Sequence, residues 1–313
     1  MIMKKIGITG GTGFVGRHLT ALLIRKGYEV VIFTTHNANT RGRHKQHISY
    51  SYWDPEKEEC DINVLKTLDA IINLAGAGIA DKRWREKRKI EIVDSRVKST
   101  KFLVAMLNAH APSCKTFITA SATGFYGPDS HYSSSFTETA QPFNDFLGNT
   151  CKQWEAASEG ISASVRRVVL RFGIVLSKGG GAFQQFVNPM SMGVLPILGS
   201  GGQVVSWIEM HDLVRLILFS LEHEQVSGIY NAVAPGHVSN RKLMNTIAAL
   251  KGGLKIPFHV PSALLKVLLG EMSIEVLKSC TVSADKIIKT GFTFEHPDIE
   301  SAVRAILTAA PKK

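Results

Sequence analysis

Three glycines near the start of the chain have the spacing of a phosphate-binding turn. Gly10, Gly13 and Gly16 form G-x-x-G-x-x-G in "TGGTGFVG", between an apolar run at 5–9 and a helical pattern at 14–26. The first glycine lets the chain turn tightly, the second lets backbone approach a pyrophosphate, and the third lets helix and strand pack closely. The helix N-terminus then offers free N–H groups to the phosphate charge. We therefore predict dinucleotide binding, the alternative being a tight turn with a structural role only.

The segment that follows the next strand, "EVVIF" at 29–33, indicates which dinucleotide. An acidic residue at the end of this strand would bind the ribose 2′-hydroxyl of NAD. The chain instead continues "TTHNANTRGRHK", which has no acid and carries Arg41, Arg43 and Lys45. These cations would stabilise a 2′-phosphate, so we favour NADP(H) over NAD(H). A loop whose charges are merely solvated is the alternative.

Apolar runs and helical patterns alternate along the first half of the chain. Further strands are expected at 48–53, 70–74, 115–120 and 164–172, and helices near 83–109 and 144–159. This alternation predicts an α/β fold with a Rossmann-type, doubly wound parallel sheet. We assign the Rossmann domain to residues 1–175, with a later strand near 229–233 that could return to the sheet. A smaller C-terminal substrate lobe is assigned to most of 176–313.

The composition is that of a soluble globular protein. Among 313 residues, 44% are hydrophobic and 20% charged, which argues against disorder. The net charge of +11 comes from scattered residues apart from "KRWREKRK" at 82–89, so attraction for an anionic cofactor or substrate explains it better than nucleic acid does. Four cysteines form no C-x-x-C pair, and no apolar stretch could serve as a leader or span a bilayer. We expect a cytoplasmic protein with neither a metal site nor a membrane partner.

Several ordered motifs resemble those of a known superfamily. "TGGTGFVG", "NLAG", "SATGFYG" and "LRFGIVL" are similar to the motifs of extended or atypical short-chain dehydrogenase/reductases. Longer stretches, "INLAGAGIADKRW" with "DSRV", "GSGGQVVSWIEMHDLV", "GIYNAVAPGHVSN" and "VSADKIIKTGFTF", narrow the resemblance to epimerase-family proteins. That group is described as NAD-dependent or nucleoside-diphosphate-sugar epimerases, or as cell-division-inhibitor homologues. The resemblance covers nearly the whole chain and implies a Rossmann domain that holds NADP(H), a substrate lobe, and a monomer or homodimer.

The resemblance also implies which residues bind the cofactor. Besides the three glycines, they are Thr12, Phe14 and Val15 at the pyrophosphate, Thr34, Thr35, His36 and Arg41 near the 2′-phosphate, Trp53 and Asp54 at the adenine, Leu74, Ala75 and Gly76 on the ribose and nicotinamide side, and Ser95, Ala120, Ser121, Ala122, Phe172, Gly173 and Ile174 along the rest of the channel. Two positions depart from the pattern. Thr35 stands where relatives often have arginine, and Glu209 stands where histidine is usual.

The proton donor of the superfamily is missing. Ordinary members pair a serine or threonine with Tyr-x-x-x-Lys, in which the lysine cation lowers the tyrosine pKa and the tyrosine acts as the acid. In "FLGNTCKQWEAA" these positions hold Leu147 and Cys151, and the serine position holds Ala122. Weak candidates for a displaced donor are Ser121, Thr123, Tyr126, Cys151 and His211, with Glu209 and bound water as further possibilities. Cys151 could equally be inert packing, Tyr126 a wall of the pocket, and His211 structural.

Three interpretations of the whole chain follow from this loss. It could be an oxidoreductase or epimerase-like enzyme with a displaced donor, acting on a hydroxylated or carbonyl substrate such as a nucleotide sugar. It could be a non-catalytic NADP(H)-dependent sensor or regulatory protein. The third interpretation is a structural remnant that binds neither coenzyme nor substrate, and the intact glycine turn favours this interpretation least.

The segment "GSGGQVVSW" at 199–207 bears on the substrate side. Its glycines and its terminal tryptophan suit a substrate lid with an aromatic platform, or equally a glycine-rich hairpin with a core tryptophan. Candidates for substrate contact are Gln185, Gln203, Ser206 and Trp207.

Overall fold

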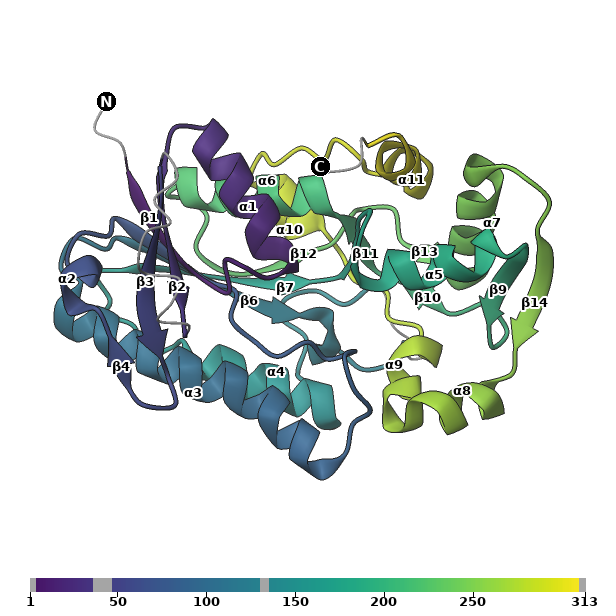
Figure 1. Cartoon of the computed structure of the whole chain (residues 1–313), viewed down its shortest axis with the longest axis horizontal. Helices are drawn as coiled ribbons and strands as arrows, with labels where there is room; N and C mark the ends of the chain where they lie inside the picture. The colour runs from purple at the N-terminus through teal and green to yellow at the C-terminus, as the bar shows by residue number, and fades with distance from the viewer. Residues whose placement is uncertain (1–3, 36–46, 130–134, 310–313) are drawn as a thin grey trace.

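The protein, described here by a computed structural model for residues 4–35, 47–129 and 135–309, is built on one large sheet (Figure 1). The eight strands lie in the order β12-β7-β6-β5-β1-β2-β3-β4. Their bounds are β1 (Lys5–Thr9), β2 (Glu29–Thr34), β3 (Ile48–Asp54), β4 (Glu59–Cys60), β5 (Ala70–Asn73), β6 (Thr116–Ala122), β7 (Arg166–Phe172) and β12 (Gly228–Ala232). Every neighbouring pair is parallel except β3 with β4. The predicted doubly wound α/β fold is confirmed, and the strand near 229–233 does return to the sheet.

Helices cover both faces of the sheet because successive residues of a strand point to opposite faces. In Figure 1, α1 (Phe14–Arg25), α6 (Met210–Glu222) and α10 (Asp285–Lys289) lie above the sheet. On the opposite face lie α2 (Ile62–Leu65), α3 (Glu86–His110) and α4 (Phe146–Ala157). Within β6, Ile118 belongs to the core on the α6 face and its neighbour Phe117 to the core on the α3 face. Both layers are therefore fixed by the same alternating strands.

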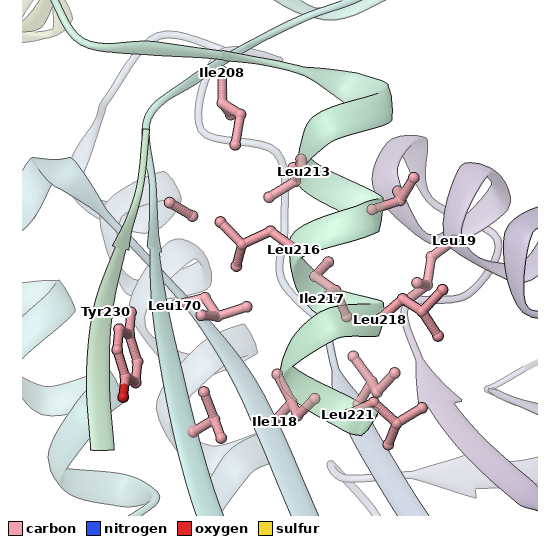
Figure 2. Packing of buried hydrophobic residues seen from close by; sticks show 14 of the residues in the cluster. Leu19, Ile118, Leu170, Ile208, Leu213, Leu216, Ile217, Leu218, Leu221 and Tyr230 are labelled. Atoms are coloured by element: carbon pink, nitrogen blue, oxygen red, sulfur yellow. The ribbon is translucent and has the colours of Figure 1, made fainter. Parts of the chain in front are cut away.

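Helix α6 shows how one face is packed. Leu213, Leu216, Ile217 and Leu221 recur at the three- and four-residue spacing of a buried helix face. Figure 2 shows Leu213 and Leu216 directed toward the strands that carry Leu170 and Tyr230, with Leu218 beside Leu19 of α1. Because α6 comes from the second half of the chain and packs on the sheet, the division at residue 175 remains a prediction.

The smaller C-terminal lobe has its own core. Its elements are β8 (Ile174–Leu176), α5 (Gly181–Ser191), β9 (Val194–Leu198), β10 (Val204–Val205), β11 (Trp207–Glu209), β13 (Val238–Ser239), α7 (Asn240–Lys251), β14 (Ile256–Val260), α8 (Ser262–Leu269), the short 3₁₀ turn η3 (Gly270–Met272), α9 (Ser273–Leu277) and α11 (Ile299–Thr308). Phe183, Trp207, Leu243 and Val303 are among its fully or nearly fully buried side chains. Across residues 4–35, 47–129 and 135–309, no helix combines the length and the apolar character needed to cross a membrane.

Glu209 fixes the point at which α6 begins. Its carboxylate accepts hydrogen bonds from the backbone N–H groups of His211 and Asp212, the two residues that follow the first residue of the helix. The side chain is only 7% exposed, and this burial raises the pKa of Glu209 to about 7, although the N–H bonds act in the opposite direction. The residue that departs from the family pattern is therefore a helix cap.

We predict that Glu209→Gln changes how stability depends on pH. Between about 4.5 and 7 the folded chain holds a proton on Glu209 that the unfolded chain has lost, so wild-type stability falls as the pH rises through this window. Glutamine keeps an acceptor oxygen and removes the titration. Relative to wild type, Glu209→Gln should gain about 1–3 kcal/mol in unfolding free energy between about pH 5 and pH 8.

Urea unfolding at the two pH values measures this difference. Glu300→Gln, on the exposed surface of α11, serves as the control for the loss of one carboxylate. An unfolding free-energy difference between Glu209→Gln and wild type that stays constant with pH would contradict the prediction.

Candidate functional site

The turn between β1 and α1 is packed backbone against backbone. Gly10 has φ +67°, a conformation that favours glycine, and the Gly13 N–H donates to the Gly10 carbonyl at 2.9 Å. A Cβ atom on Gly10 would lie 2.6 Å from the Leu74 carbonyl oxygen, and one on Gly16 would lie 2.3 Å from the Gly10 carbonyl oxygen. The first and third glycines are therefore required for this turn to form at all.

The N-terminus of α1 is suited to an anion. Gly13 is its N-cap residue, so no described side chain caps the helix, and its first turn holds no acidic residue. Uncapped N–H groups at a helix start carry the positive end of the helix dipole. The turn thus leaves a cradle of backbone donors in which a side chain would intrude, and this fits a pyrophosphate.

A buried hydrogen-bond network links the carboxyl ends of the central strands β1, β5 and β6. Thr9 at the end of β1 donates to Asn73 Oδ1 at 2.6 Å, and Asn73 Nδ2 donates to Thr100 at 2.9 Å and to Thr119 of β6 at 3.2 Å. Thr100 lies on α3 and also accepts from the Trp154 indole of α4 at 3.2 Å. The network ties three strands and two helices together at the edge where a ligand would bind. Sequence reasoning did not single out Asn73, although a polar residue that ends an apolar strand was the available signal.

The structure brings most of the predicted cofactor residues to this carboxyl edge of the sheet. Residues 10–16 form the β1–α1 turn, Thr34 and Thr35 end and follow β2, Leu74, Ala75 and Gly76 follow β5, Ala120, Ser121 and Ala122 end β6, and Phe172, Gly173 and Ile174 join β7 to β8. Ser95 of α3 accepts a hydrogen bond from the Ala77 N–H at 3.0 Å and so holds the loop after β5. His36 and Arg41 lie outside the described residues.

The two residues expected at the adenine have structural contacts of their own. Trp53 is 5% exposed and packs in the core on the α3 face. Asp54 accepts hydrogen bonds from the Glu56 N–H at 3.0 Å and the Tyr52 hydroxyl at 3.2 Å. Their contact with an adenine stays a prediction, and the burial of Trp53 speaks against a role for its ring.

The two positions of α4 at which ordinary superfamily members have tyrosine and lysine are buried in this protein. Leu147 is 6% exposed and Cys151 is 4% exposed. Burial, with a smaller contribution from Glu155, raises the pKa of the Cys151 thiol to about 12. The thiol therefore stays protonated near neutral pH and is neither a nucleophile nor an acid, which agrees with the interpretation as inert packing.

Ser121 and Tyr126 belong to a second buried network, which is centred on an ion pair. Arg171 of β7 donates to both carboxylate oxygens of Glu155 of α4, each at 2.8 Å. Ser121 donates to the same carboxylate at 2.6 Å, and Arg171 also donates to the Tyr126 hydroxyl at 2.8 Å. That hydroxyl in turn donates to Asn231 Oδ1 of β12 at 2.7 Å. Both candidate hydroxyls thus stabilise the meeting point of α4, β6, β7 and β12.

The expectation that Tyr126 forms a wall of the pocket is wrong. Its side chain is fully buried, and this burial raises its pKa to about 12, despite the Arg171 charge that acts in the opposite direction. The buried position of the tyrosine is stabilised by its hydroxyl, which accepts a hydrogen bond from Arg171 and donates one to Asn231.

Thr123 and His211 have different surroundings. Thr123 begins the 3₁₀ turn η2 (Thr123–Phe125) directly after β6 and is partly exposed. Its carbonyl accepts from the Tyr126 N–H, whereas its hydroxyl has no hydrogen-bond partner among the described residues. His211 lies on α6, across the sheet from α4, and its Nε2 is 3.3 Å from Glu295 Oε2. The structure therefore does not bring His211 together with Ser121 and Cys151.

The tryptophan of the segment 199–207 belongs to the core, so the interpretation of this segment as a lid with an aromatic platform is wrong. The alternative of a hairpin is also wrong, because β9 pairs with β14, β10 with β13 and β11 with β8. Trp207 is fully buried and donates to the Gly236 carbonyl at 2.8 Å. Ser206 donates to the Cys280 carbonyl at 2.7 Å, and Gln203 Nε2 donates to the Leu198 carbonyl at 3.0 Å. Of the four substrate candidates, Gln185 on α5 alone is exposed. The start of α5 meets the glycine turn, since a Cβ on Gly180 would lie 2.7 Å from the Phe14 ring.

Known proteins share both the sequence and the architecture of this chain. Residues 6–232 match the model of the NAD dependent epimerase/dehydratase family, and residues 260–306 match a domain of unknown function, DUF1731. Epimerase family protein YfhF of Bacillus subtilis is 34% identical over 310 residues, which cover 96% of this chain and 97% of that protein. Epimerase family protein SAR0825 of Staphylococcus aureus is 34% identical over 309 residues, with 98% and 100% covered.

Two solved structures extend the comparison. The human epimerase family protein SDR39U1, described with NADPH, superposes with a TM-score of 0.84 at 28% identity, covering 96% of this chain and 98% of that one. A nucleoside-diphosphate sugar epimerase of Corynebacterium glutamicum gives a TM-score of 0.76 at 30% identity, covering 97% of this chain and 58% of that one. On the family match and these full-length relatives, this chain belongs to the NAD dependent epimerase/dehydratase family.

Proposed function

We propose that this protein binds NADP(H) and is an oxidoreductase or epimerase-like enzyme for a hydroxylated or carbonyl substrate, such as a nucleotide sugar. The observation that carries the proposal is the cradle at the start of α1, where uncapped backbone donors face a turn in which the first and third glycines leave no room for a side chain. A pyrophosphate is the ligand that such a turn fits. The bound nicotinamide would supply hydride transfer.

The preference for the phosphorylated coenzyme rests on the end of β2. The strand ends at Thr34, and neither it nor the exposed Thr35 is an acid that would bind a free 2′-hydroxyl. The human relative whose structure contains NADPH supports the same choice. The cations Arg41, Arg43 and Lys45, which lie outside the described residues, would supply the positive charge for the 2′-phosphate in this proposal.

The chain's own contribution to the chemistry would come from Thr123. Ser121 and Tyr126 donate within the Arg171 network and the Cys151 thiol is buried, whereas the Thr123 hydroxyl, after the end of β6, has no hydrogen-bond partner among the described residues and would contact a substrate oxygen. A threonine hydroxyl does not ionise near neutral pH, so its role would be to relay a proton between that oxygen and water.

A second candidate is a non-catalytic, NADP(H)-dependent sensor or regulator. The burial of Leu147 and Cys151 favours it, because no acid can act from those positions.

Both candidate functions are proposed for a cytoplasmic protein that is a monomer or a homodimer and has no nucleic-acid or membrane partner. All four cysteines are free thiols, which is what a reducing compartment would maintain.

We predict that Gly16→Ala weakens NADPH binding at least about tenfold. The new Cβ would meet the Gly10 carbonyl oxygen at 2.3 Å and Gly11 Cα at 2.7 Å, and neither backbone group can move without opening the cradle. Fluorescence titration with NADPH, repeated with NADH, measures the affinity and the coenzyme preference together.

Gly160→Ala is the matched control, since its added Cβ would meet nothing closer than Val104 at 3.7 Å. Circular dichroism establishes that both variants are folded. Wild-type protein that binds neither coenzyme would end the proposal, and tighter binding of NADH would end the preference for NADP(H).

We predict that Thr123→Val lowers kcat by about 10²-fold and leaves NADPH affinity unchanged, because valine keeps the shape and removes the relay. Turnover is measured as NADPH oxidation with a panel of carbonyl compounds and nucleotide sugars. Thr123→Ser should retain most activity. Tight NADPH binding without turnover anywhere in the panel would favour the sensor, and full activity of Thr123→Val would remove this residue from the mechanism.

A further inference from the structure

Arg96 lies beside the place where the usual lysine is absent. It projects from α3 into the space between the loop after β5 and α4. Its Cζ atom lies 5.2 Å from the centre of the Trp154 ring, and a Cβ atom on Gly76 would lie 3.0 Å from Cζ and 3.3 Å from Nε. The guanidinium charge is also close enough to Cys151 to act on its thiol. Gly76, Cys151 and Trp154 thus surround a cation that comes from a different helix.

One edge of this guanidinium is left without a hydrogen-bond partner by the part of the chain that the structure describes. Nη1 donates to the Ile92 carbonyl at 3.0 Å, one turn back on α3. Neither Nε nor Nη2 has a hydrogen-bond partner among the described residues. These two atoms form the edge of an arginine that matches the two oxygens of a carboxylate or a phosphate. Because Gly76 has no side chain, no Cβ presses on this side of the guanidinium, where one would lie 3.3 Å from Nε.

The neighbouring arginines are paired with carboxylates, and Arg96 is not. Arg171 forms two of its hydrogen bonds with Glu155, and Arg88 contacts Glu91 at 2.7 Å. Asp94, close to Arg96 in sequence, pairs with Lys98 instead at 2.7 Å. Within the described part of the chain, no acidic side chain forms an ion pair with Arg96.

An unpaired cation in this position is energetically costly. Arg96 is only partly exposed, and burial lowers its pKa, with the like charge of Arg88 acting in the same direction. A partly buried charge is stabilised when an opposite charge supplies the missing hydrogen bonds. An anionic ligand group would do this, and the partial exposure of the side chain lets such a group reach it.

We propose that Arg96 binds an oxyanion of the substrate, a carboxylate or a phosphate, through its Nε and Nη2 edge. The assignment rests on the proposed function and on the expectation from the family resemblance that Gly76 lies on the ribose and nicotinamide side of the coenzyme. It narrows the substrate class to hydroxylated or carbonyl compounds that carry such an anionic group. Gly76 is part of the site because a side chain there would press on Cζ and Nε of the guanidinium.

The test compares wild type with Arg96→Met and Arg96→Lys in the full-length chain. Malonate and inorganic phosphate serve as carboxylate and phosphate probes, with affinity measured by ligand-observed NMR in the presence and absence of NADP⁺. Arg96→Met should weaken the better-bound probe at least about tenfold, and Arg96→Lys should weaken it less, since lysine keeps the charge without the planar edge. NADPH affinity should change by no more than about twofold in either variant. Lys98→Met, an exposed cation on the same helix, is the control and should change neither.

The probe that binds more tightly identifies the anionic group, and probe affinities unaffected by Arg96→Met overturn the proposal. A loss of NADPH affinity with unchanged probe binding would assign Arg96 to the coenzyme and equally overturn it. If wild type binds no coenzyme, the proposed function fails, while the titrations without NADP⁺ still decide whether Arg96 binds an oxyanion. If Arg96→Met does not fold, Gly76→Ala replaces it: a methyl group pressing on Cζ and Nε should weaken the same probe, and unchanged binding would again contradict the assignment.

Discussion

The contact that the rest of the structure depends on is the one between the β1–α1 turn and the loop after β5. With the Leu74 carbonyl in place, any side chain at Gly10 would overlap the backbone, and any side chain at Gly16 would overlap Gly10. These contacts fix the position of the turn relative to the ends of the strands, and α1 begins directly after the turn. The Thr9–Asn73–Thr119 hydrogen bonds join the carboxyl ends of β1, β5 and β6, so this part of the edge is positioned without a ligand.

A second constraint explains why helix α4 keeps its position without its usual chemistry. Glu155 is buried with Arg171, and removing one partner of such a pair leaves an uncompensated charge that costs roughly 3–5 kcal/mol. Trp154 adds a hydrogen bond to Thr100 of α3. With the helix anchored by these two residues, Leu147 and Cys151 contribute packing only. Ser121 and Tyr126 are hydrogen-bonded to the same ion pair. These two hydroxyl groups therefore stabilise the fold and do not replace the missing acid.

The sequence was informative where a structural requirement is local. Apolar runs predicted the central strands, and the glycine spacing predicted the β1–α1 turn, because both depend on neighbours in the chain. It was uninformative where partners are distant. Whether Trp207 faces a ligand or the core is decided by Gly236, and the fate of Tyr126 by Asn231. Arg96 lies in "DSRV", a motif that could be quoted from the sequence but given no role, because Gly76 and Trp154 surround it only in the fold.

The position of Arg96 also limits what kind of catalysis this fold can support. A lysine on α4 lowers the pKa of a tyrosine on the same helix, so that one helix provides both charge and proton. An arginine on α3 remains protonated near neutral pH, so it can neutralise or orient a negative oxygen without giving up a proton. In the proposed enzyme, charge stabilisation and proton transfer would then come from different elements, the first from α3 and the second from the end of β6 or from water. A substrate that brings its own anionic group would suit this separation, since the arginine would orient the molecule and leave the reacting oxygen to a neutral hydroxyl.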